Sequence, residues 1–183
     1  MSVTELKRGT ATQLLIGCGT NRDKRMGLTP SQADDPGWQQ LTTLDINPAH
    51  HPDVVWDLRE KPWPFDDDTF DEVHAYEVLE HLGRQGDAEA FFSDFSEIWR
   101  ILKPGGHLLG TSPSAGSPWL WGDPGHTRAI IPESFIFLCQ DEYENQVGKN
   151  AMSDYRYCYS ADFKPKMLEV NNGTFSYVLE AIK

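Results

Sequence analysis

The chain has 183 residues, a formal net charge of −12 and a pI of about 4.8. This length suits one domain with a sizeable core, and the acidic balance disfavours nucleic acid as a large partner because it offers phosphates little attraction. The cysteines Cys18, Cys139 and Cys158 show no close pairing, which is typical of a reducing compartment. With no signal peptide or long apolar run, we expect a cytoplasmic protein without a membrane partner.

A local basic cluster leaves RNA open as a partner. It consists of Lys7, Arg8, Arg22, Lys24 and Arg25. An ordinary solvated face is the simpler explanation of such a cluster. We therefore expect the partner to be a small-molecule or peripheral acceptor, and the sequence does not indicate an oligomeric state.

The first predicted strand, about 13–17, follows a polar stretch (1–12) that we expect to be flexible. It runs directly into the glycine-rich sequence Gly17-Cys18-Gly19. An apolar run followed by glycines predicts a buried strand and a loop in which the backbone approaches a ligand closely. Such loops bind the anionic or ribose-bearing part of a nucleotide-like cofactor through main-chain N–H groups.

The segment between this loop and the second strand is polar and supports at most a short helix near 31–35. The second strand, 41–46, carries Asp45 near its end, where a ribose-binding acid is expected. A third strand is predicted over 53–58, with Asp57 at its end, and a fourth over 71–76.

Asp87 can cap a helix that ends near Leu102, with apolar residues on the face expected to meet a sheet. A strand over 107–111, a loop rich in Ser, Pro and Trp, and a helix from about 132 to 143 follow. Two further strands, 163–170 and 174–181, are joined by Asn171-Asn172-Gly173, which is typical of a hairpin. The alternation of strands and helices predicts a parallel sheet, and the hairpin adds an antiparallel strand at its end.

These segments together resemble the class I S-adenosylmethionine-dependent methyltransferases of the small, single-domain type 11 kind. The residues that carry the resemblance are 14–19, 44–46, 56–58, 69–71, 77–82 and 98–106. Segment 121–128 is also similar to phage and prophage methyltransferase-like proteins. The resemblance implies a single α/β domain over residues 1–183, with a Rossmann-like, doubly wound, mostly parallel seven-stranded sheet and an antiparallel last strand.

The resemblance also implies a site for S-adenosylmethionine. The glycine loop would line the methionine moiety and ribose, and Asp45 would accept hydrogen bonds from both ribose hydroxyls. Ile46 would pack on the adenine, with Asp57 on its amino group and the Leu58 N–H on a ring nitrogen. The implied cofactor-binding residues are Gly17, Cys18, Gly19, Asp45, Ile46, Asp57, Leu58, Tyr76 and Glu77, the last two near the methionine end.

Two positions depart from the family pattern. An acid usually stands two residues before the first glycine, where this chain has Leu15. Without this acid, the protein has one hydrogen-bond acceptor fewer for the amino group of the cofactor, which weakens its binding. A third glycine is usual where this chain has Asn21, and asparagine tolerates the positive φ that such a turn may require.

The sequence Glu77-x-x-Glu80-His81 places two carboxylates and an imidazole at helical spacing. With His126 as a fourth ligand, it resembles the divalent-metal site of small-RNA 2′-O-methyltransferases and the related segment of ubiquinone-pathway O-methyltransferases. A cation there would orient substrate oxygens and lower the pKa of a hydroxyl. The alternative is structural, with Glu80 capping or pairing and His81 packing beside the site.

The loop after the fifth strand carries the second set of candidates. His126 is the candidate general base, because an imidazole pKa lies near neutrality. Trp119 and Trp121 would line the acceptor site or form a structural lid, with Asp123 pairing with Arg128 in the second case. The alternating tyrosines Tyr155, Tyr157 and Tyr159 would line the same mouth or belong to a strand packed on one face.

The sequence thus predicts a methyltransferase that acts on oxygen or nitrogen of an acceptor it does not name. Two alternatives stay open. A non-catalytic binding module with the same fold is suggested by Leu15 and by the thin first helix. A nicotinamide-dependent dehydrogenase is compatible with the glycine loop and a later acid, although its third glycine is missing.

Overall fold

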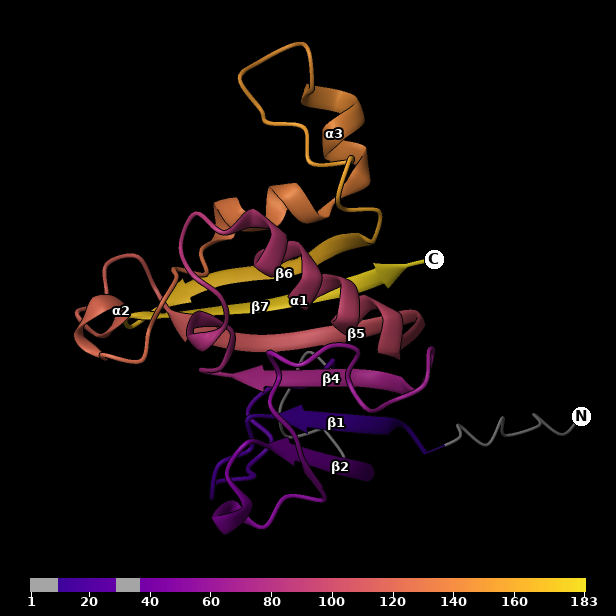
Figure 1. Cartoon of the computed structure of the whole chain (residues 1–183), viewed down its shortest axis with the longest axis vertical. Coiled ribbons are helices and arrows are strands. Elements are labelled where there is room, and N and C mark those ends of the chain that lie inside the picture. Colours follow the sequence, from indigo (N-terminus) through magenta and orange to yellow (C-terminus); the bar gives the residue numbers. More distant parts are fainter. Residues whose placement is uncertain (1–9, 29–36) are drawn as a thin grey trace, which may run out of the picture.

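In the residues that the computed structural model describes, 10–28 and 37–183, a seven-stranded sheet forms the centre of the molecule (Figure 1). The strand order is β3-β2-β1-β4-β5-β7-β6. The strands from β3 to β5 in this order pair in parallel, and β7 is antiparallel to both β5 and β6. This confirms the predicted fold class. The strands are β1 (Thr12–Ile16), β2 (Gln40–Asp45), β3 (Val54–Val55), β4 (Phe70–Tyr76), β5 (Leu102–Pro113), β6 (Asp162–Asn171) and β7 (Thr174–Ile182).

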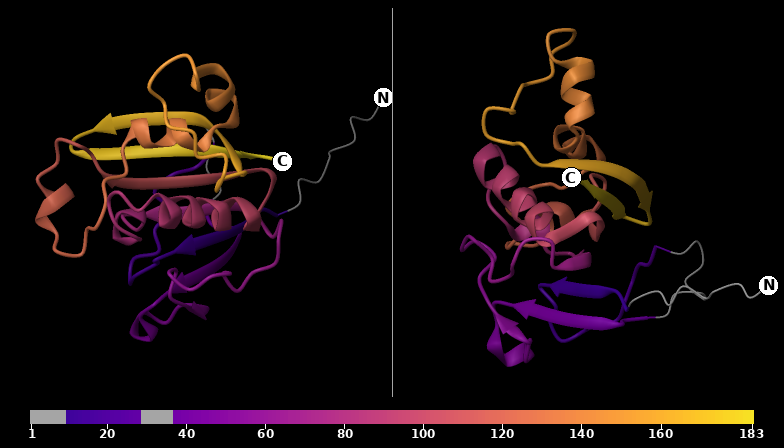
Figure 2. Two further views of the ribbon diagram at one scale, coloured as in Figure 1. Left: turned by 45° about the horizontal axis from the view of Figure 1, so that its top comes forward. Right: turned by 90° about the vertical axis from the view of Figure 1, so that its right-hand side faces the viewer.

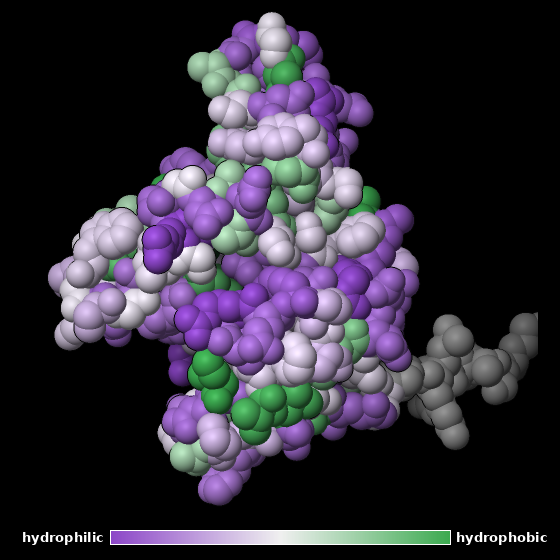
Figure 3. Space-filling view, in the orientation of Figure 1, coloured by the Kyte–Doolittle hydropathy of each residue, from purple (hydrophilic) through white to green (hydrophobic). Residues whose placement is uncertain are grey.

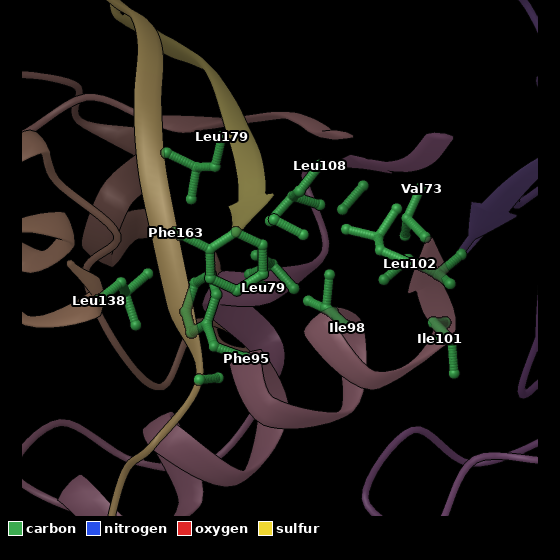
Figure 4. Packing of buried hydrophobic residues seen from close by; sticks show 14 of the residues in the cluster. Val73, Leu79, Phe95, Ile98, Ile101, Leu102, Leu108, Leu138, Phe163 and Leu179 are labelled. Carbon is green, nitrogen blue, oxygen red and sulfur yellow. The ribbon is translucent and has the colours of Figure 1, made fainter. Parts of the chain in front are cut away.

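Helix α1 (Ala88–Ile101) lies across one face of the sheet (Figure 1). Its start is fixed as predicted, because the Asp87 carboxylate accepts a hydrogen bond from the Ala90 N–H at 3.0 Å. Its buried face presents Phe95 and Ile98 to side chains from β4, β5, β6 and β7, as Figure 4 shows. Burying each such side chain stabilises the fold by roughly 1.5–3 kcal/mol.

The hairpin between β6 and β7 turns through Asn172 and Gly173. Both have positive φ, 50° and 83° respectively, as the two central residues of a type I′ turn require. Because of this turn, β7 lies between β5 and β6 and is well buried. The prediction from the Asn-Gly pair is confirmed.

Three predicted elements differ in extent. The strand expected over 107–111 is longer, since β5 spans Leu102–Pro113. The strand expected over 53–58 is formed only at Val54–Val55, and the Asp53 carboxylate before it accepts from the N–H and hydroxyl of Thr43. The helix expected over 132–143 is split at Cys139 into the 3-10 helix η4 (Pro132–Leu138) and helix α3 (Gln140–Gln146). The short helix expected near 31–35 lies outside the described residues.

Helix α3 and the loop that follows it project beyond the sheet, as both views in Figure 2 show. The alternating tyrosines lie in this loop and not in a strand, because the Tyr155 carbonyl accepts from the N–H groups of Cys158 and Tyr159 in a turn. Tyr159 is buried and Tyr157 is exposed. No helix in the described part of the chain is long and apolar enough to cross a membrane.

The opposite face of β1 and β4 is covered by irregular chain. The Glu72 carboxylate is buried there, 2.8 Å from His74 Nε2, and also accepts from Gln13. Lys24 lies 3.6 Å from Glu72 with its side chain almost fully covered. At least this member of the predicted basic cluster therefore points into the fold, and Lys7 and Arg8 lie outside the described residues.

Candidate functional site

The glycine loop after β1 lies at the carboxyl edge of the parallel strands, where ligands bind in open α/β sheets. Gly17 and Gly19 both adopt positive φ, 57° and 54°. A Cβ at Gly17 would lie 2.6 Å from Cγ2 of Val78, so glycine is required there for packing. A Cβ at Gly19 would meet no atom within 4 Å, so this second glycine faces open space that a ligand can approach.

Asp45 ends β2 directly beside this loop. Its Oδ2 accepts from the Gly19 N–H at 2.8 Å, and its Oδ1 accepts from the Asn47 N–H at 2.8 Å. His50 Nδ1 lies 3.2 Å from Oδ1. Burial raises the pKa of Asp45, but the hydrogen bonds from Asn47 and Gly19, together with His50, outweigh it and hold the pKa below its ordinary value. The structure thus joins the predicted loop and acid in one unit.

Exposed aliphatic side chains mark the position predicted for adenine. Ile46, which directly follows β2, is 56% exposed, and Val55, the β3 partner of Asp45, is 52% exposed. Figure 3 shows apolar surface gathered near this end of the sheet, at the lower part of the view. The Leu58 N–H has no hydrogen-bond acceptor among the described residues, as the predicted contact with a ring nitrogen requires.

Asp57, predicted to bind the adenine amino group, already has a partner. Arg59 reaches it through Nε at 2.9 Å from Oδ1 and through Nη2 at 2.6 Å from Oδ2. These hydrogen bonds lower the pKa of Asp57. Because the Arg59 side chain is 69% exposed, it can swing away and release one carboxylate oxygen.

Tyr76 ends β4 as predicted, but its side chain holds the segment after the glycine loop. Its hydroxyl accepts from the N–H groups of Arg25 and Met26 and lies 2.7 Å from His74 Nδ1. Burial raises the pKa of Tyr76 to about 12. The ring packs with Leu15 and Cys18, so the position of the usual family acid is an apolar packing position in this chain.

Asn21 does not use the left-handed conformation that the sequence interpretation allowed for. The non-glycine residues with positive φ in the described chain are His51, Asp68, Glu77 and Asn172. Asn21 accepts a hydrogen bond from the Asp23 N–H at 2.8 Å. The turn therefore continues without a third glycine because this side chain stabilises it locally.

Glu77 follows β4 with a φ of 57°, and its N–H donates to the Thr111 carbonyl at 2.9 Å. A glutamate in this region is strained by about 1 kcal/mol or more, and such strain gathers at functional sites. The turn also separates Glu77 from the short 3-10 helix η3 (Leu79–His81). Glu77 therefore does not share a helical face with Glu80 and His81.

Glu80 is fully buried behind the edge of the sheet. Its Oε2 accepts from the Ser112 hydroxyl at 2.9 Å, whereas Oε1 has no hydrogen-bond partner in the described chain. Burial raises the pKa of Glu80 to about 7, and the nearby charge of Glu77 acts in the same direction. Burial raises the pKa of the Tyr177 hydroxyl well above its ordinary value, and Glu80 acts in the same direction. This hydroxyl also has no hydrogen-bond partner among the described residues.

His81 and His126 meet Glu80 at this point. His126 Nε2 lies 4.0 Å from Glu80 Oε1, and ligand atoms of all three residues lie within 4.8 Å of one another. His81 Nδ1 lies 3.1 Å from the Gly125 carbonyl and His126 Nδ1 lies 3.2 Å from the Leu120 carbonyl. A carbonyl only accepts, so each Nδ1 carries a proton, and Nε2 is the ring nitrogen that a neutral imidazole can offer to a metal ion.

Three of the four predicted metal ligands are therefore brought together, and Glu77 lies outside the group. The donor set of one carboxylate and two imidazoles suits a transition-metal ion such as Zn²⁺. Bonds of about 2.1 Å keep two ligands of one ion within ~4.2 Å of each other. Glu80 Oε1 and His126 Nε2 already lie within this limit. The largest separation among the ligand atoms of Glu80, His81 and His126 would have to shorten by only several tenths of an ångström.

The loop that carries His126 includes the short helix α2 (Trp119–Gly122). Trp119 and Trp121 are 68% and 61% exposed, so they do not form a packed structural lid in this conformation. The pairing of Asp123 with Arg128 suggested by the sequence is not formed. Asp123 accepts from the Gly125 N–H at 2.7 Å, and Arg128 donates to main-chain carbonyls elsewhere.

Sequence reasoning missed the residues around Glu80. Ser112 comes from β5 and Tyr177 from β7, so the pairing of β7 with β5 brings them together. A Cβ at Gly110 would collide with the Tyr177 ring, which shows how closely the two strands approach. Neither residue stands in a motif, and the sheet register that joins them has no local signal.

The same fold occurs in solved structures of known methyltransferases. A SAM-dependent methyltransferase from Archaeoglobus fulgidus is similar, with 20% identity, a TM-score of 0.57, and 96% of this chain and 87% of that chain covered. The N-methyltransferase NodS from Bradyrhizobium japonicum, in complex with S-adenosyl-L-homocysteine, has 15% identity and a TM-score of 0.54 over 95% of this chain and 79% of that chain. An S-adenosylmethionine-dependent methyltransferase from Mesorhizobium loti has 13% identity and a TM-score of 0.54, over 94% and 91% of the two chains.

No curated protein matches the chain. A family model does, and it covers the glycine loop, the end of β2, the turn after β4 and helix α1. Its match spans residues 14–110, just over half of the 183 residues. The chain therefore belongs to the family described as the methyltransferase domain.

Proposed function

We propose that this protein transfers a methyl group from S-adenosylmethionine to an oxygen or nitrogen atom of an acceptor. The observation that carries the proposal is the hydrogen bond between Gly19 and Asp45, which aligns a ligand-facing glycine with an acid at the carboxyl edge of the sheet. The exposed Ile46 beside it offers an apolar surface for a purine. Membership of the methyltransferase domain family favours this function over nicotinamide chemistry.

When bound, the cofactor supplies a methyl group on a sulfonium, which needs no further activation. The unit of Gly19 and Asp45 would hold the cofactor, and its methyl group would pass to an acceptor lone pair while sulfur kept the electron pair of the carbon–sulfur bond. The work of the protein is to align the reactants and to receive the acceptor proton. Val78 packs against Gly17 and holds the glycine loop in a fixed geometry, which serves the alignment of the reactants.

Glu77 is the carboxylate best placed to hold the amino group of the cofactor. The usual acid is replaced by Leu15, which is 2% exposed and packed in an apolar cluster. Glu77 follows β4 next to Val78, which contacts the glycine loop, and its side chain remains partly exposed. Its strained conformation turns the chain at this point instead of continuing the strand.

We also propose that Glu80, His81 and His126 hold a divalent cation. This proposal is supported by two imidazoles whose Nδ1 atoms are held by carbonyls. They face the Glu80 Oε1, which accepts no hydrogen bond from the described residues. A cation there would orient acceptor oxygens and lower the pKa of an acceptor hydroxyl. The alternative, His126 as a general base, is less favoured because its side chain is 6% exposed and its Nε2 faces Glu80.

The test of the main proposal is calorimetric titration of the purified protein with S-adenosylmethionine, S-adenosylhomocysteine and NADH. Micromolar binding of the two adenosyl compounds, with NADH silent, supports the proposal and justifies an acceptor screen for S-adenosylhomocysteine release. Binding of NADH alone would overturn it. Binding without turnover on any acceptor would support the non-catalytic binding module, and no binding would refute the cofactor assignment.

A further inference from the structure

A cavity whose lining does not include the glycine loop lies beside the start of α1. Its volume is about 290 Å³, enough for a small organic molecule. It is bordered by residues 84–88, which lead into α1, by residues 128–137, and by the loop after α3. Phe91, Phe137 and Tyr155 give it aromatic walls, and Ala88 and Ala129 leave room between them.

Arg128 lines this cavity and is the feature that calls for a ligand. It is 4% exposed, and no carboxylate of the described chain lies within 4.0 Å of its guanidinium. Its Nη2 donates to the carbonyls of Arg84 and Asp87, at 3.0 and 3.1 Å, and its Nε has no hydrogen-bond partner among the described residues. The charges of Asp94 and Asp87 act on the guanidinium only from beyond ion-pair distance, so an anion that enters the cavity gains from pairing with it directly.

The surroundings of Arg128 favour one negative charge rather than two. The Arg128 Cζ lies 5.3 Å from the Phe91 ring centroid, so the guanidinium is held over an aromatic face. The first turn of α1 adds a partial positive charge at the same place. The exposed carboxylates of Asp87 and Glu133 also line the cavity and would repel a dianion. Asp94, the nearest buried acid, is already paired with Lys61 at 2.7 Å.

We propose that this cavity binds a small aromatic monocarboxylate, with its ring between the aromatic walls and its carboxylate on Arg128. Gly83 supports the arrangement, because a Cβ there would collide with Nη2 of Arg128 and push the guanidinium out of place. The site does not depend on the proposed methyl transfer, since none of the cofactor-binding residues lines it.

Titration with sodium benzoate, followed by the methyl NMR signals of Ala88 and Ala129, tests the proposal in the absence of any cofactor. We expect saturable binding in the millimolar range or tighter, with benzamide at least ~10-fold weaker because it lacks the charge. Phenylphosphate should also bind more weakly than benzoate. Equal binding of benzamide, stronger binding of phenylphosphate, or no saturation would each overturn the proposal.

Two variants locate the site without removing Arg128, whose loss would also free two loop carbonyls. Ala129→Leu fills the cavity and should abolish the benzoate response, whereas Ala151→Leu, on the exposed loop after α3, should leave it unchanged. Arg128→Lys keeps the positive charge but not the planar shape of the guanidinium. It should weaken the binding of benzoate by about 10-fold and leave the binding of benzamide unchanged. Full benzoate binding in Ala129→Leu would place the ligand elsewhere and refute the assignment.

Discussion

Oδ2 of Asp45 accepts a hydrogen bond from the main-chain nitrogen of Gly19 at 2.8 Å, so the end of β2 and the loop after β1 form one unit. The same carboxylate accepts from the Asn47 N–H, which leaves lone pairs on both oxygens for further donors. Two vicinal hydroxyls of a ribose are suitable donors. The arrangement holds the acid in position before any ligand arrives, which lowers the entropic cost of binding.

Replacing Asp45 with Asn should therefore lower the affinity for S-adenosylhomocysteine. Hydrogen bonds to a charged acceptor contribute about 1.5–3 kcal/mol, which corresponds to a loss of roughly 10- to 100-fold. Calorimetric titration measures it. Asp53→Asn is the matched control, because the Asp53 carboxylate also accepts hydrogen bonds from β2, through Thr43, but has no hydrogen bond with the glycine loop among the described residues. Equal affinities for wild type and Asp45→Asn would contradict the ribose assignment.

The two loop glycines should respond differently to alanine. Gly17→Ala places a Cβ 2.6 Å from Val78 and also strains a φ of 57°, so it should destabilise the fold by about 2–4 kcal/mol. Gly19→Ala adds only the strain, about 1–2 kcal/mol, but places a methyl group in the ligand space and should weaken cofactor binding. Urea unfolding and calorimetry separate the two effects.

A second substitution checks the cause of the Gly17 effect. Val78→Ala removes the methyl groups that the new Cβ would meet, so the double variant Gly17→Ala/Val78→Ala should be more stable than the sum of the single changes predicts. Strict additivity of the two free-energy changes would show that the contact with Val78 is not the reason that position 17 is glycine.

Much of this edge of the sheet could be predicted from sequence because its signals are local. The first buried strand, the Asp87 cap and the Asn172-Gly173 turn each depend on signals within a few residues, and all three were confirmed. The single helix predicted over 132–143 was wrong, because the segment forms a 3-10 helix as far as Leu138. The chain then turns extended at Cys139, and the Tyr143 hydroxyl donates back to Phe137.

The site was less predictable than the fold because its chemistry depends on backbone conformation and sheet register. The spacing of Glu77, Glu80 and His81 matches one face of an α-helix, but the positive φ of Glu77 takes it out of the group. The contact of Ser112 with Glu80 depends on how β5 passes the turn after β4. A single sequence holds no signal for either, whereas the acid after β2 follows from strand order alone.

The buried network on the opposite face should make stability depend on pH. Burial raises the pKa of Glu72, but hydrogen bonds from His74 and Gln13 and the charge of Lys24 outweigh it, so its pKa is lowered in the folded protein. A carboxylate with a lowered pKa stabilises the fold above the pKa of the unfolded chain, and this contribution is lost as the pH falls through the folded pKa. Glu72→Gln should cost about 1–3 kcal/mol at pH 7.

The cost of Glu72→Gln should shrink as the pH falls below about 4.5, the ordinary pKa of a glutamate, because the unfolded wild-type chain takes up a proton there and the folded carboxylate does so only at lower pH. Urea unfolding at several pH values, from neutrality to below the lowered pKa of Glu72 in the folded protein, measures the difference. Glu97→Gln provides the comparison, since Glu97 also has a lowered pKa but pairs with Arg100 on another element. A difference that stays constant over the same pH range would contradict the network.

The roles of His126 and His81 can be separated by activity measurements with and without a chelator. A cation held by both imidazoles predicts that His81→Ala and His126→Ala lower turnover to a similar extent, by about 10- to 100-fold, and that EDTA brings the wild type to the same level. Added Mn²⁺ or Zn²⁺ should restore only the wild type. Affinity for S-adenosylhomocysteine should stay unchanged, because neither residue belongs to the Gly19 and Asp45 unit. If His126 is instead a general base, only His126→Ala would lose turnover, and EDTA would have no effect on the wild type. The loss of turnover would then be largest for acceptors of low basicity, because proton removal limits the rate for them.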